Sequence, residues 1–145
     1  MIVSFSHINR RVRDLDETIE FYTKYLGFYL LRRYRRAGRG EAAYIGLGDL
    51  LFELGVVDDP AQLPQDGIEG RLGLAVTDLD GVLAELRRNG VEVVEDARDM
   101  TTAWGRQAAI KDPNGYVIAL REWSPPDGPH FDGWQPRHAS VERVG

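Results

Sequence analysis

Two segments of the chain carry apolar residues at the spacing of one helical face. The first stripe recurs at intervals of four, three and four residues and is made of Leu15, Ile19, Tyr22 and Leu26. A second stripe consists of Leu79, Val82, Leu83 and Leu86. This period predicts two amphipathic helices. We expect Asp14, with Glu17 completing a capping box, and Asp78 to cap the helices, and Gly27 and Gly90 to end them.

The stretch after each helix is typical of strands separated by turns. After the first helix, strands are expected at residues 28–35, 42–47 and 50–57, with turns at 37–40 and at Gly48-Asp49. After the second helix, strands are expected at 91–96, 106–111 and 116–123. The last two are joined by Asp112-Pro113-Asn114-Gly115, in which Pro and Gly suit turn positions.

The chain also repeats itself. Residues 7–16 resemble residues 71–80 at an offset of 64, with Val, Asp, Leu and Asp identical in register. Each half therefore has the order βαβββ, and the fold class is predicted to be α+β, with two tandem modules forming a curved mixed sheet around a concave cavity. We expect one domain over 1–123, made of module 1 at about 3–57, a linker at 58–70 and module 2 at 71–123. A Pro-rich tail follows at 124–145.

Composition narrows the class of protein. The chain has 145 residues, of which 43% are hydrophobic and 28% charged, as in a soluble globular protein. No apolar run is long enough to cross a membrane and no signal peptide is recognisable, so we expect a cytoplasmic protein with no membrane partner. The absence of Cys excludes disulfides and thiolate chemistry. The net charge of −5 disfavours nucleic acid as a partner, and the Arg-rich run 32–36 is expected to place one row in solvent and one near the cleft.

Several motifs together resemble one known superfamily. They are His7-Ile8, residues 12–16, Phe21-Tyr22, residues 26–28, residues 51–54 and residues 112–118. Over residues 3–123 the chain resembles the vicinal oxygen chelate superfamily, also called the glyoxalase, bleomycin-resistance and dioxygenase superfamily. The resemblance implies a small-molecule ligand in a cleft, a homodimer and, in catalytic members, a divalent metal. One fold hosts many chemistries, so the reaction does not follow from it.

The resemblance also implies four metal-ligand positions, and they fall on His7, Glu53, Arg71 and Ala119. The first two are competent ligands, whereas Arg stays protonated and Ala has no donor atom. We therefore expect no metal cofactor, and if a metal binds, His7 and Glu53 are its ligands. Residues considered as replacements are Glu69, Glu122, His130 and His138. Glu122 differs from position 119 by an odd number and should face the other side of the sheet.

Strand alternation assigns further residues to the predicted cavity. Asn9 and Arg11 share the face of His7, and Arg121 shares the face of position 119. The predicted catalytic residues are His7, Glu53 and Arg71, and the predicted substrate contacts are Arg121, Trp104, Arg11 and Asn9. Alternatives stay open for three of them. Arg71 either pairs with Glu53 or binds an oxyanion, and His7 either acts as a base or has only a structural role. Trp104 either stacks on a ligand or packs in the core.

Three kinds of function agree with these residues. The first is a metal-independent isomerase or lyase that removes a proton next to a carbonyl of a small oxygenated anion. The second is a protein that sequesters a small molecule, as in the bleomycin-resistance branch, and the third is a regulatory or assembly module. A metal-dependent lyase or dioxygenase with atypical ligands is a further alternative. The tail residues Phe131 and Trp134 are expected to cover the cavity, extend a dimer interface or dock on the outside.

Overall fold

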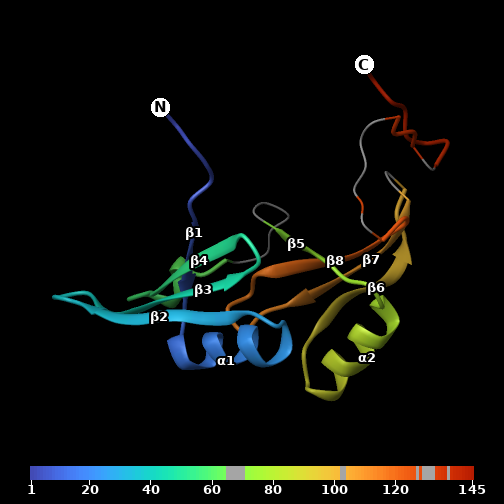
Figure 1. Ribbon diagram of the computed structural model, residues 1–145. Coiled ribbons are helices and arrows are strands. Elements are labelled where there is room, and N and C mark those ends of the chain that lie inside the picture. Colours follow the sequence, from blue (N-terminus) through green and yellow to red (C-terminus); the bar gives the residue numbers. More distant parts are fainter. Residues whose placement is uncertain (65–70, 102–103, 127, 129–132, 137) are drawn as a thin grey trace. The chain divides into compact units, whose positions relative to one another are not determined.

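A computed structural model describes the chain except for residues 65–70, 102–103, 127, 129–132 and 137. The chain divides into two compact units, Met1–Asp66 with Asp112–Gly115, and Gly67–Lys111 with Tyr116–Gly145. The strands form two four-stranded sheets, one in each βαβββ module, which confirms the predicted α+β class (Figure 1). No helix among the described residues is long and apolar enough to cross a membrane.

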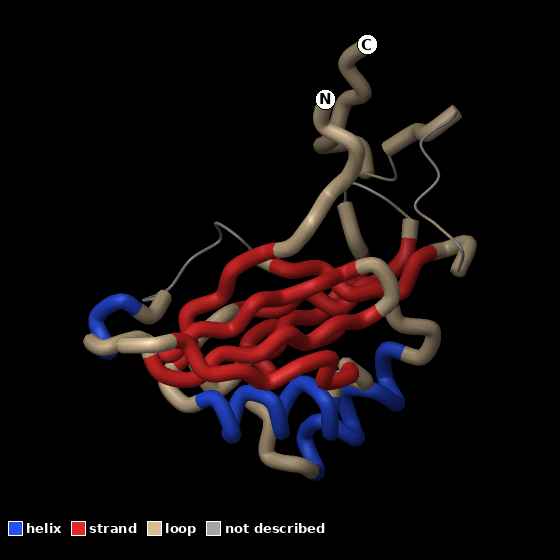
Figure 2. The backbone as a smooth tube through the Cα atoms, turned by 60° about the vertical axis from the view of Figure 1, so that its left-hand side comes forward, coloured by secondary structure: helices blue, strands red, loops and turns tan. Residues whose placement is uncertain are grey.

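The first module consists of β1 (Ile8–Val12), α1 (Leu15–Tyr25), β2 (Tyr29–Arg36), β3 (Gly40–Leu47) and β4 (Leu50–Val56). Its strand order is β1-β4-β3-β2, and only the β1–β4 pair is parallel. The helix lies on one face of this sheet (Figure 2). Between them lies an aromatic core in which Phe28 stacks on Phe52 at 5.9 Å and Tyr22 meets Phe28 edge-on at 5.0 Å. Burial of a side chain such as Phe52 contributes about 1.5–3 kcal/mol.

The second module repeats this plan with β5 (Leu72–Ala75), α2 (Leu79–Arg88), β6 (Val93–Asp99), β7 (Gly105–Lys111) and β8 (Val117–Trp123). Its strand order is β5-β8-β7-β6, again with one parallel pair. The buried residues of α2 are Leu79, Leu83 and Leu86, which belong to the predicted stripe. The two modules therefore share one pattern of hydrogen-bonded strands.

The helix ends follow the predicted caps. The Asp14 side chain accepts a hydrogen bond from the Glu17 amide, and Asp78 accepts one from the amide of Gly81. The helices end at Tyr25 and Arg88, shortly before Gly27 and Gly90, which have φ of 74° and 77°. The capping box was expected to be reciprocal, but the Glu17 carboxylate is bonded to Arg13. An ion pair with a guanidinium replaces the return bond.

The Asp112–Gly115 turn packs in the first unit although it separates β7 from β8. The Tyr22 hydroxyl donates to Asp112 Oδ2 at 2.7 Å. The Asn114 side chain accepts from the Arg13 amide at 2.7 Å and donates to Thr18 at 3.0 Å. The predicted turn is confirmed, and its two polar side chains also fix it to α1 and to the residues before α1.

Three local features differ from the sequence expectations or add to them. Strand β6 begins at Val93 and continues to Asp99, later than the expected 91–96, because Val91 closes the helix end by donating to the Leu86 carbonyl. The linker contains a 3-10 turn, η1 (Pro60–Gln62), capped by Asp59. In the described part of the tail, at 124–126, 128, 133–136 and 138–145, there is no helix or strand.

Candidate functional site

A row of polar side chains crosses the first sheet on the face opposite α1, which we call the open face. The strand register aligns Asn9 of β1 with Glu53 of β4, and Glu53 with Tyr44 of β3. The neighbouring row, Phe52 and Ile45, is fully buried beneath α1. Since side chains alternate along a strand, Asn9, Glu53 and Tyr44 share the open face.

Glu53 is the centre of this row. Its carboxylate accepts a hydrogen bond from the Tyr34 hydroxyl at 2.7 Å, and its other oxygen lies 3.3 Å from Nε2 of His7. Tyr34 stacks on Tyr44 with ring centroids 5.6 Å apart, and His7 meets the Tyr44 ring edge-on at 6.3 Å. The Glu53 side chain keeps 23% of its exposure and that of His7 33%, so both are within reach of a ligand. Two aromatic rings thus hold the His7–Glu53 pair in place.

Hydrogen bonding keeps Glu53 ionised. The hydrogen bond from Tyr34 has the largest influence and lowers the pKa of Glu53, whereas burial of the carboxylate raises it. The charges of His7 and Arg36 also lower this pKa. The same bond raises the pKa of the Tyr34 hydroxyl. An ionised carboxylate with a lowered pKa is a weak base for carbon acids but a good acceptor for an imidazole N–H. Glu53 is therefore suited to accept a hydrogen bond from the imidazole and to orient His7.

His7 has a contact at each ring nitrogen. Nε2 faces Glu53, and Nδ1 lies 2.9 Å from the Ser6 hydroxyl. A neutral ring satisfies both contacts with its proton on Nε2, donating to the carboxylate, while Nδ1 accepts from Ser6; this tautomer is assigned from the contacts. Nδ1 is then the basic atom. Ser6 is exposed, so its hydroxyl is also accessible to water.

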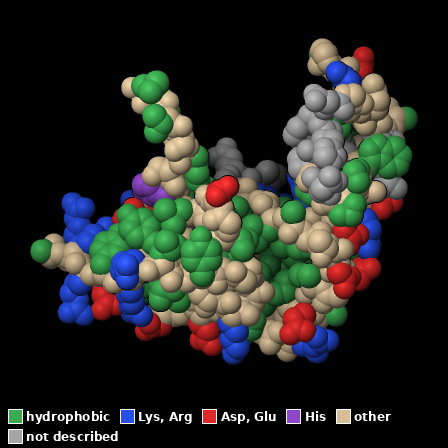
Figure 3. Space-filling model, in the orientation of Figure 1, with side chains coloured by type: hydrophobic (Ala, Val, Ile, Leu, Met, Phe, Trp, Pro, Cys, Tyr) green, Lys and Arg blue, Asp and Glu red, His purple; other side chains and the backbone are tan. Residues whose placement is uncertain are grey.

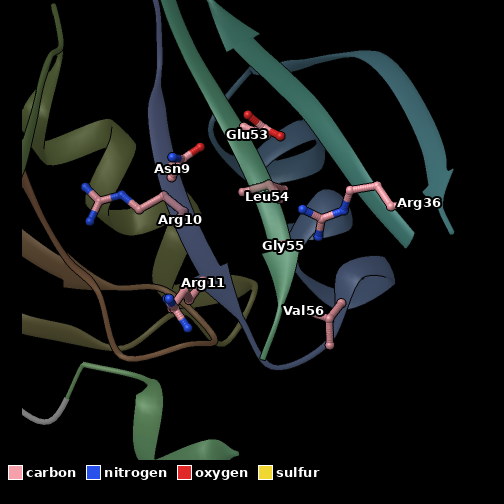
Figure 4. A pocket seen from close by; sticks show the side chains of 8 residues that line it. All are labelled: Asn9, Arg10, Arg11, Arg36, Glu53, Leu54, Gly55 and Val56. Atoms are coloured by element: carbon pink, nitrogen blue, oxygen red, sulfur yellow. The ribbon is translucent and has the colours of Figure 1, made fainter. Parts of the chain in front are cut away.

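A pocket of about 320 Å³ opens beside this row and lies within the first unit (Figure 4). Its lining residues are Asn9, Arg10, Arg11, Arg36, Glu53, Leu54, Gly55 and Val56. Three of the predicted site residues, Asn9, Arg11 and Glu53, therefore share one cavity, with His7 bonded to the third. Three arginines and one carboxylate give the pocket a net positive charge.

The structure places the other predicted residues in the second unit. Arg71 pairs with Glu95 at 3.2 Å, a partner that the sequence did not indicate. The guanidinium of Arg121 lies over the Trp123 ring at 5.5 Å. Trp104 is 54% exposed, so the alternative that it packs in the core is wrong. The convergence of Arg71 and Arg121 with His7 stays a prediction.

Tyr34 and Tyr44 were not predicted as site residues. Tyr34 lies in the Arg-rich run 32–36, where alternation indicated one row near the cleft, and it shares that row with Arg36 of the pocket. The other row faces away: Arg33 pairs with Asp16 of α1 and with Glu41, and Arg35 also pairs with Glu41. Figure 3 shows the cationic side chains that gather at the end of the molecule where the β2–β3 hairpin lies.

The strand register allows the expected metal positions to be tested. Asn9 pairs with Glu53 in the parallel pair of the first module, and Gly73 pairs with Ala119 in that of the second. His7 and Arg71 each precede these registers by two residues, so Arg71 and Ala119 are the equivalents of His7 and Glu53. Among the described residues, no group of three or more His, Cys, Asp or Glu side chains is close enough to hold a metal ion. Two donors do not fit a site that normally takes three or more protein ligands.

The two replacement ligands that lie among the described residues are bonded to other groups. Glu122 is turned toward α2, as alternation predicted, where its carboxylate accepts from the Leu79 amide at 2.7 Å. His138 is bonded to Ser140 in the tail. Glu69, His130 and the tail residue Phe131 lie outside the described residues.

Comparison with known proteins agrees with the fold and the repeat. The model of the Glyoxalase/Bleomycin resistance protein/Dioxygenase superfamily matches residues 4–120. Lactoylglutathione lyase of Neisseria meningitidis is 31% identical over 117 residues, which cover 77% of this chain and 85% of that protein. Lactoylglutathione lyase of Escherichia coli O157:H7 is also 31% identical, over 125 residues, which cover 80% of this chain and 90% of that protein.

Solved structures show the same fold at lower identity. A glyoxalase family protein from Enterococcus faecalis superposes with a TM-score of 0.68 at 24% identity, covering 82% of this chain and 97% of that one. The fosfomycin resistance protein FosX from Listeria monocytogenes superposes with a TM-score of 0.67 at 18% identity, covering 83% of this chain and 93% of that one. With the family model matching most of its length, this chain belongs to the Glyoxalase/Bleomycin resistance protein/Dioxygenase superfamily.

Proposed function

We propose that the protein is an isomerase or lyase that moves a proton at a carbon next to a carbonyl group of a small anionic compound, without a metal. The observation that carries this proposal is the His7–Glu53 pair, with Nε2 and Oε2 3.3 Å apart on the open face. An imidazole supported by an ionised carboxylate is suited to general base catalysis near neutral pH. Two relatives at 31% identity that are named as lyases support the assignment to an enzyme.

Each step uses a group of the first unit. Nδ1 of His7 takes the proton from the carbon, and the electron pair of the broken C–H bond moves to the carbonyl oxygen, which becomes an enolate. The Glu53 carboxylate stabilises the imidazolium through Nε2, and the Asn9 amide, beside Glu53 in the register, donates to the enolate oxygen. Return of the proton to the same carbon gives epimerisation or exchange, and return to a neighbouring atom gives isomerisation.

The test is hydrogen exchange in D₂O. Protein treated with EDTA is incubated with S-lactoylglutathione and, separately, with pyruvate, and loss of the proton next to the carbonyl is followed by NMR. We expect exchange in the wild-type protein, and we expect the exchange rate of His7→Ala to be lower by a factor of about 100 or more. His138→Ala is the matched control and should exchange at the wild-type rate. A wild-type protein that exchanges neither compound, or a His7→Ala variant that retains the rate, would overturn the proposal.

A metal-dependent lyase with atypical ligands is the second candidate. The specific observation in its favour is the 31% identity to lactoylglutathione lyases, together with the contact between His7 and Glu53. Elemental analysis of the purified protein, followed by exchange measurements with added Zn²⁺ or Ni²⁺, separates the two candidates. Stoichiometric metal and exchange only in its presence would select this alternative. Tight binding of either compound without exchange would select sequestration instead.

Arg71, Arg121, Trp104 and Arg11 are proposed as substrate contacts. For Arg71 the ion pair with Glu95 occupies one guanidinium nitrogen and leaves others for an oxyanion. Arg71→Ala should raise KM more than it lowers kcat in the exchange assay. An unchanged KM would remove Arg71 from the site.

A further inference from the structure

The pocket beside Glu53 contains a cation that the proposed proton transfer does not use. Arg36, the last residue of β2, extends from its strand toward Gly55 of β4 (Figure 4). Its Nε is buried and has no hydrogen-bond partner among the residues that the structure describes. The odd-numbered arginines of the run, Arg33 and Arg35, are both ion-paired to Glu41 on the opposite side. Arg36 thus points into the pocket with hydrogen-bonding capacity to spare.

Gly55 makes the room for this guanidinium. A methyl group built on Gly55 would lie 3.4 Å from the terminal nitrogen of Arg36, at the limit of ordinary contact. Any longer side chain at this position would occupy the space in front of the guanidinium. The absence of a side chain at residue 55 therefore opens the pocket at the point where Arg36 ends.

Arg36 and Glu53 are placed to meet two ends of one molecule. Glu53 and Gly55 are two positions apart on β4, with Leu54 between them, which is about 6.6 Å along a strand. Both positions lie on the open face, and Arg11 lines the same pocket from β1. A guanidinium binds carboxylate and phosphate groups with paired, charge-assisted hydrogen bonds, which are stronger than neutral ones.

We propose that Arg36 is the anion anchor of the pocket: it binds a carboxylate or phosphate group of the substrate at Gly55 while the reacting carbon lies at the His7–Glu53 pair. This inference deepens the proposed function and rests on it for the reaction. The binding of the anion, however, needs no proton transfer and is measured separately. Arg36 is a specificity residue in this scheme, because it selects molecules that carry an oxyanion.

The experiment measures binding of small anions by isothermal titration calorimetry at low salt. Malonate and inorganic phosphate are the two probes, which distinguish a carboxylate site from a phosphate site, and neutral malonamide is the uncharged control. The variants are Arg36→Gln, which removes the charge, and Gly55→Leu, which fills the pocket and keeps every charge. Arg35→Gln is the matched control, with the same change of charge one residue away on the other face.

We expect the wild-type protein to bind one of the two anions and not malonamide. Arg36→Gln and Gly55→Leu should each raise Kd about tenfold or more, and Arg35→Gln should stay within about twofold of the wild type. Circular dichroism and the unfolding midpoint check that each variant is folded. If Gly55→Leu does not fold, Gly55→Val is used, since it is smaller and still obstructs the guanidinium.

Two results would overturn the anchor: neither anion binds the wild-type protein, or Arg36→Gln binds as well as Arg35→Gln does. Kinetics separate this failure from that of the proposed function. Anion binding that depends on Arg36 in a protein without hydrogen exchange refutes the reaction and keeps the anchor. Exchange with the same KM in Arg36→Gln as in the wild type refutes the anchor and keeps the reaction.

Discussion

The hydrogen bond between Tyr22 and Asp112 predicts a measurable share of the stability of the first unit. Tyr22 is 2% exposed and Asp112 6%, and the hydroxyl donates to the carboxylate at 2.7 Å. Hydrogen bonds to charged groups contribute about 1.5–3 kcal/mol. Tyr22→Phe keeps the ring in the aromatic core and removes only the donor. We therefore expect a loss of about 1.5–3 kcal/mol in the free energy of unfolding, which at roughly 2–4 °C per kcal/mol lowers the Tm by about 3–12 °C.

Urea unfolding followed by far-UV circular dichroism and tyrosine fluorescence tests this value. The matched control is Tyr25→Phe, on the same helix, for which we expect a change within about 0.5 kcal/mol. The slope of the free energy against urea should be the same in all three proteins, because the surface exposed on unfolding does not change. The reasoning is refuted if Tyr22→Phe and Tyr25→Phe destabilise the protein equally.

Three further predictions concern single positions. The hydrogen bond from Tyr34 lowers the pKa of Glu53 in the folded chain below the value near 4.5 that the group has when unfolded. The ionised carboxylate therefore stabilises the fold at pH values above 4.5, and this contribution is lost as the pH falls through the pKa of the folded state. In Tyr34→Phe, NMR titration should show a higher Glu53 pKa, and unfolding measurements a weaker loss of stability in acid; an unchanged titration curve would contradict the assigned cause. Gly105→Ala should unfold the protein or lower its free energy of unfolding by more than about 2 kcal/mol, because φ is +127° and the new Cβ would lie 2.1 Å from the Glu122 carbonyl oxygen. Gly73→Ala is the control: a Cβ at residue 73 would have nothing within 4 Å, so the variant should be neutral or slightly stabilising in the same urea assay. Glu122→Ala removes the carboxylate that accepts a hydrogen bond from the first amide of α2, and it should lower the free energy of unfolding by about 0.5–2 kcal/mol in thermal unfolding while anion binding stays as in the wild type. A stability equal to that of the wild type would show that this hydrogen bond contributes nothing.

Features that depend on neighbouring residues could be predicted from the sequence. The caps at Asp14 and Asp78 and the turn at residues 112–115 follow from local preferences, and the structure confirms them. Alternation along strands likewise turned Glu122 to the other face.

Features that depend on distant partners could not be predicted. Tyr34 reaches Glu53 through the pairing of β2 with β3, and this pairing is shifted between Leu30 and Arg32 by an irregularity that no local pattern indicates. The anchoring of the Asp112 turn to Tyr22 joins residues 90 positions apart. For Arg71, the choice between Glu53 and an external anion did not include Glu95, which lies on β6, the last strand in the order β5-β8-β7-β6.

The repeat shows how far the two modules differ at equivalent positions of their parallel strand pairs. The two parallel strand pairs have the same register, but Asn9 with Glu53 in one corresponds to Gly73 with Ala119 in the other. The first pair presents an amide and a carboxylate to a ligand, whereas the second presents almost no side chain. Arg71 completes the contrast, because it stands where the first module has a histidine and its charge is opposed by Glu95. The three groups proposed above all come from the first module: the imidazole belongs to His7, which precedes β1, the carboxylate to Glu53 of β4, and the anion-binding guanidinium to Arg36 of β2.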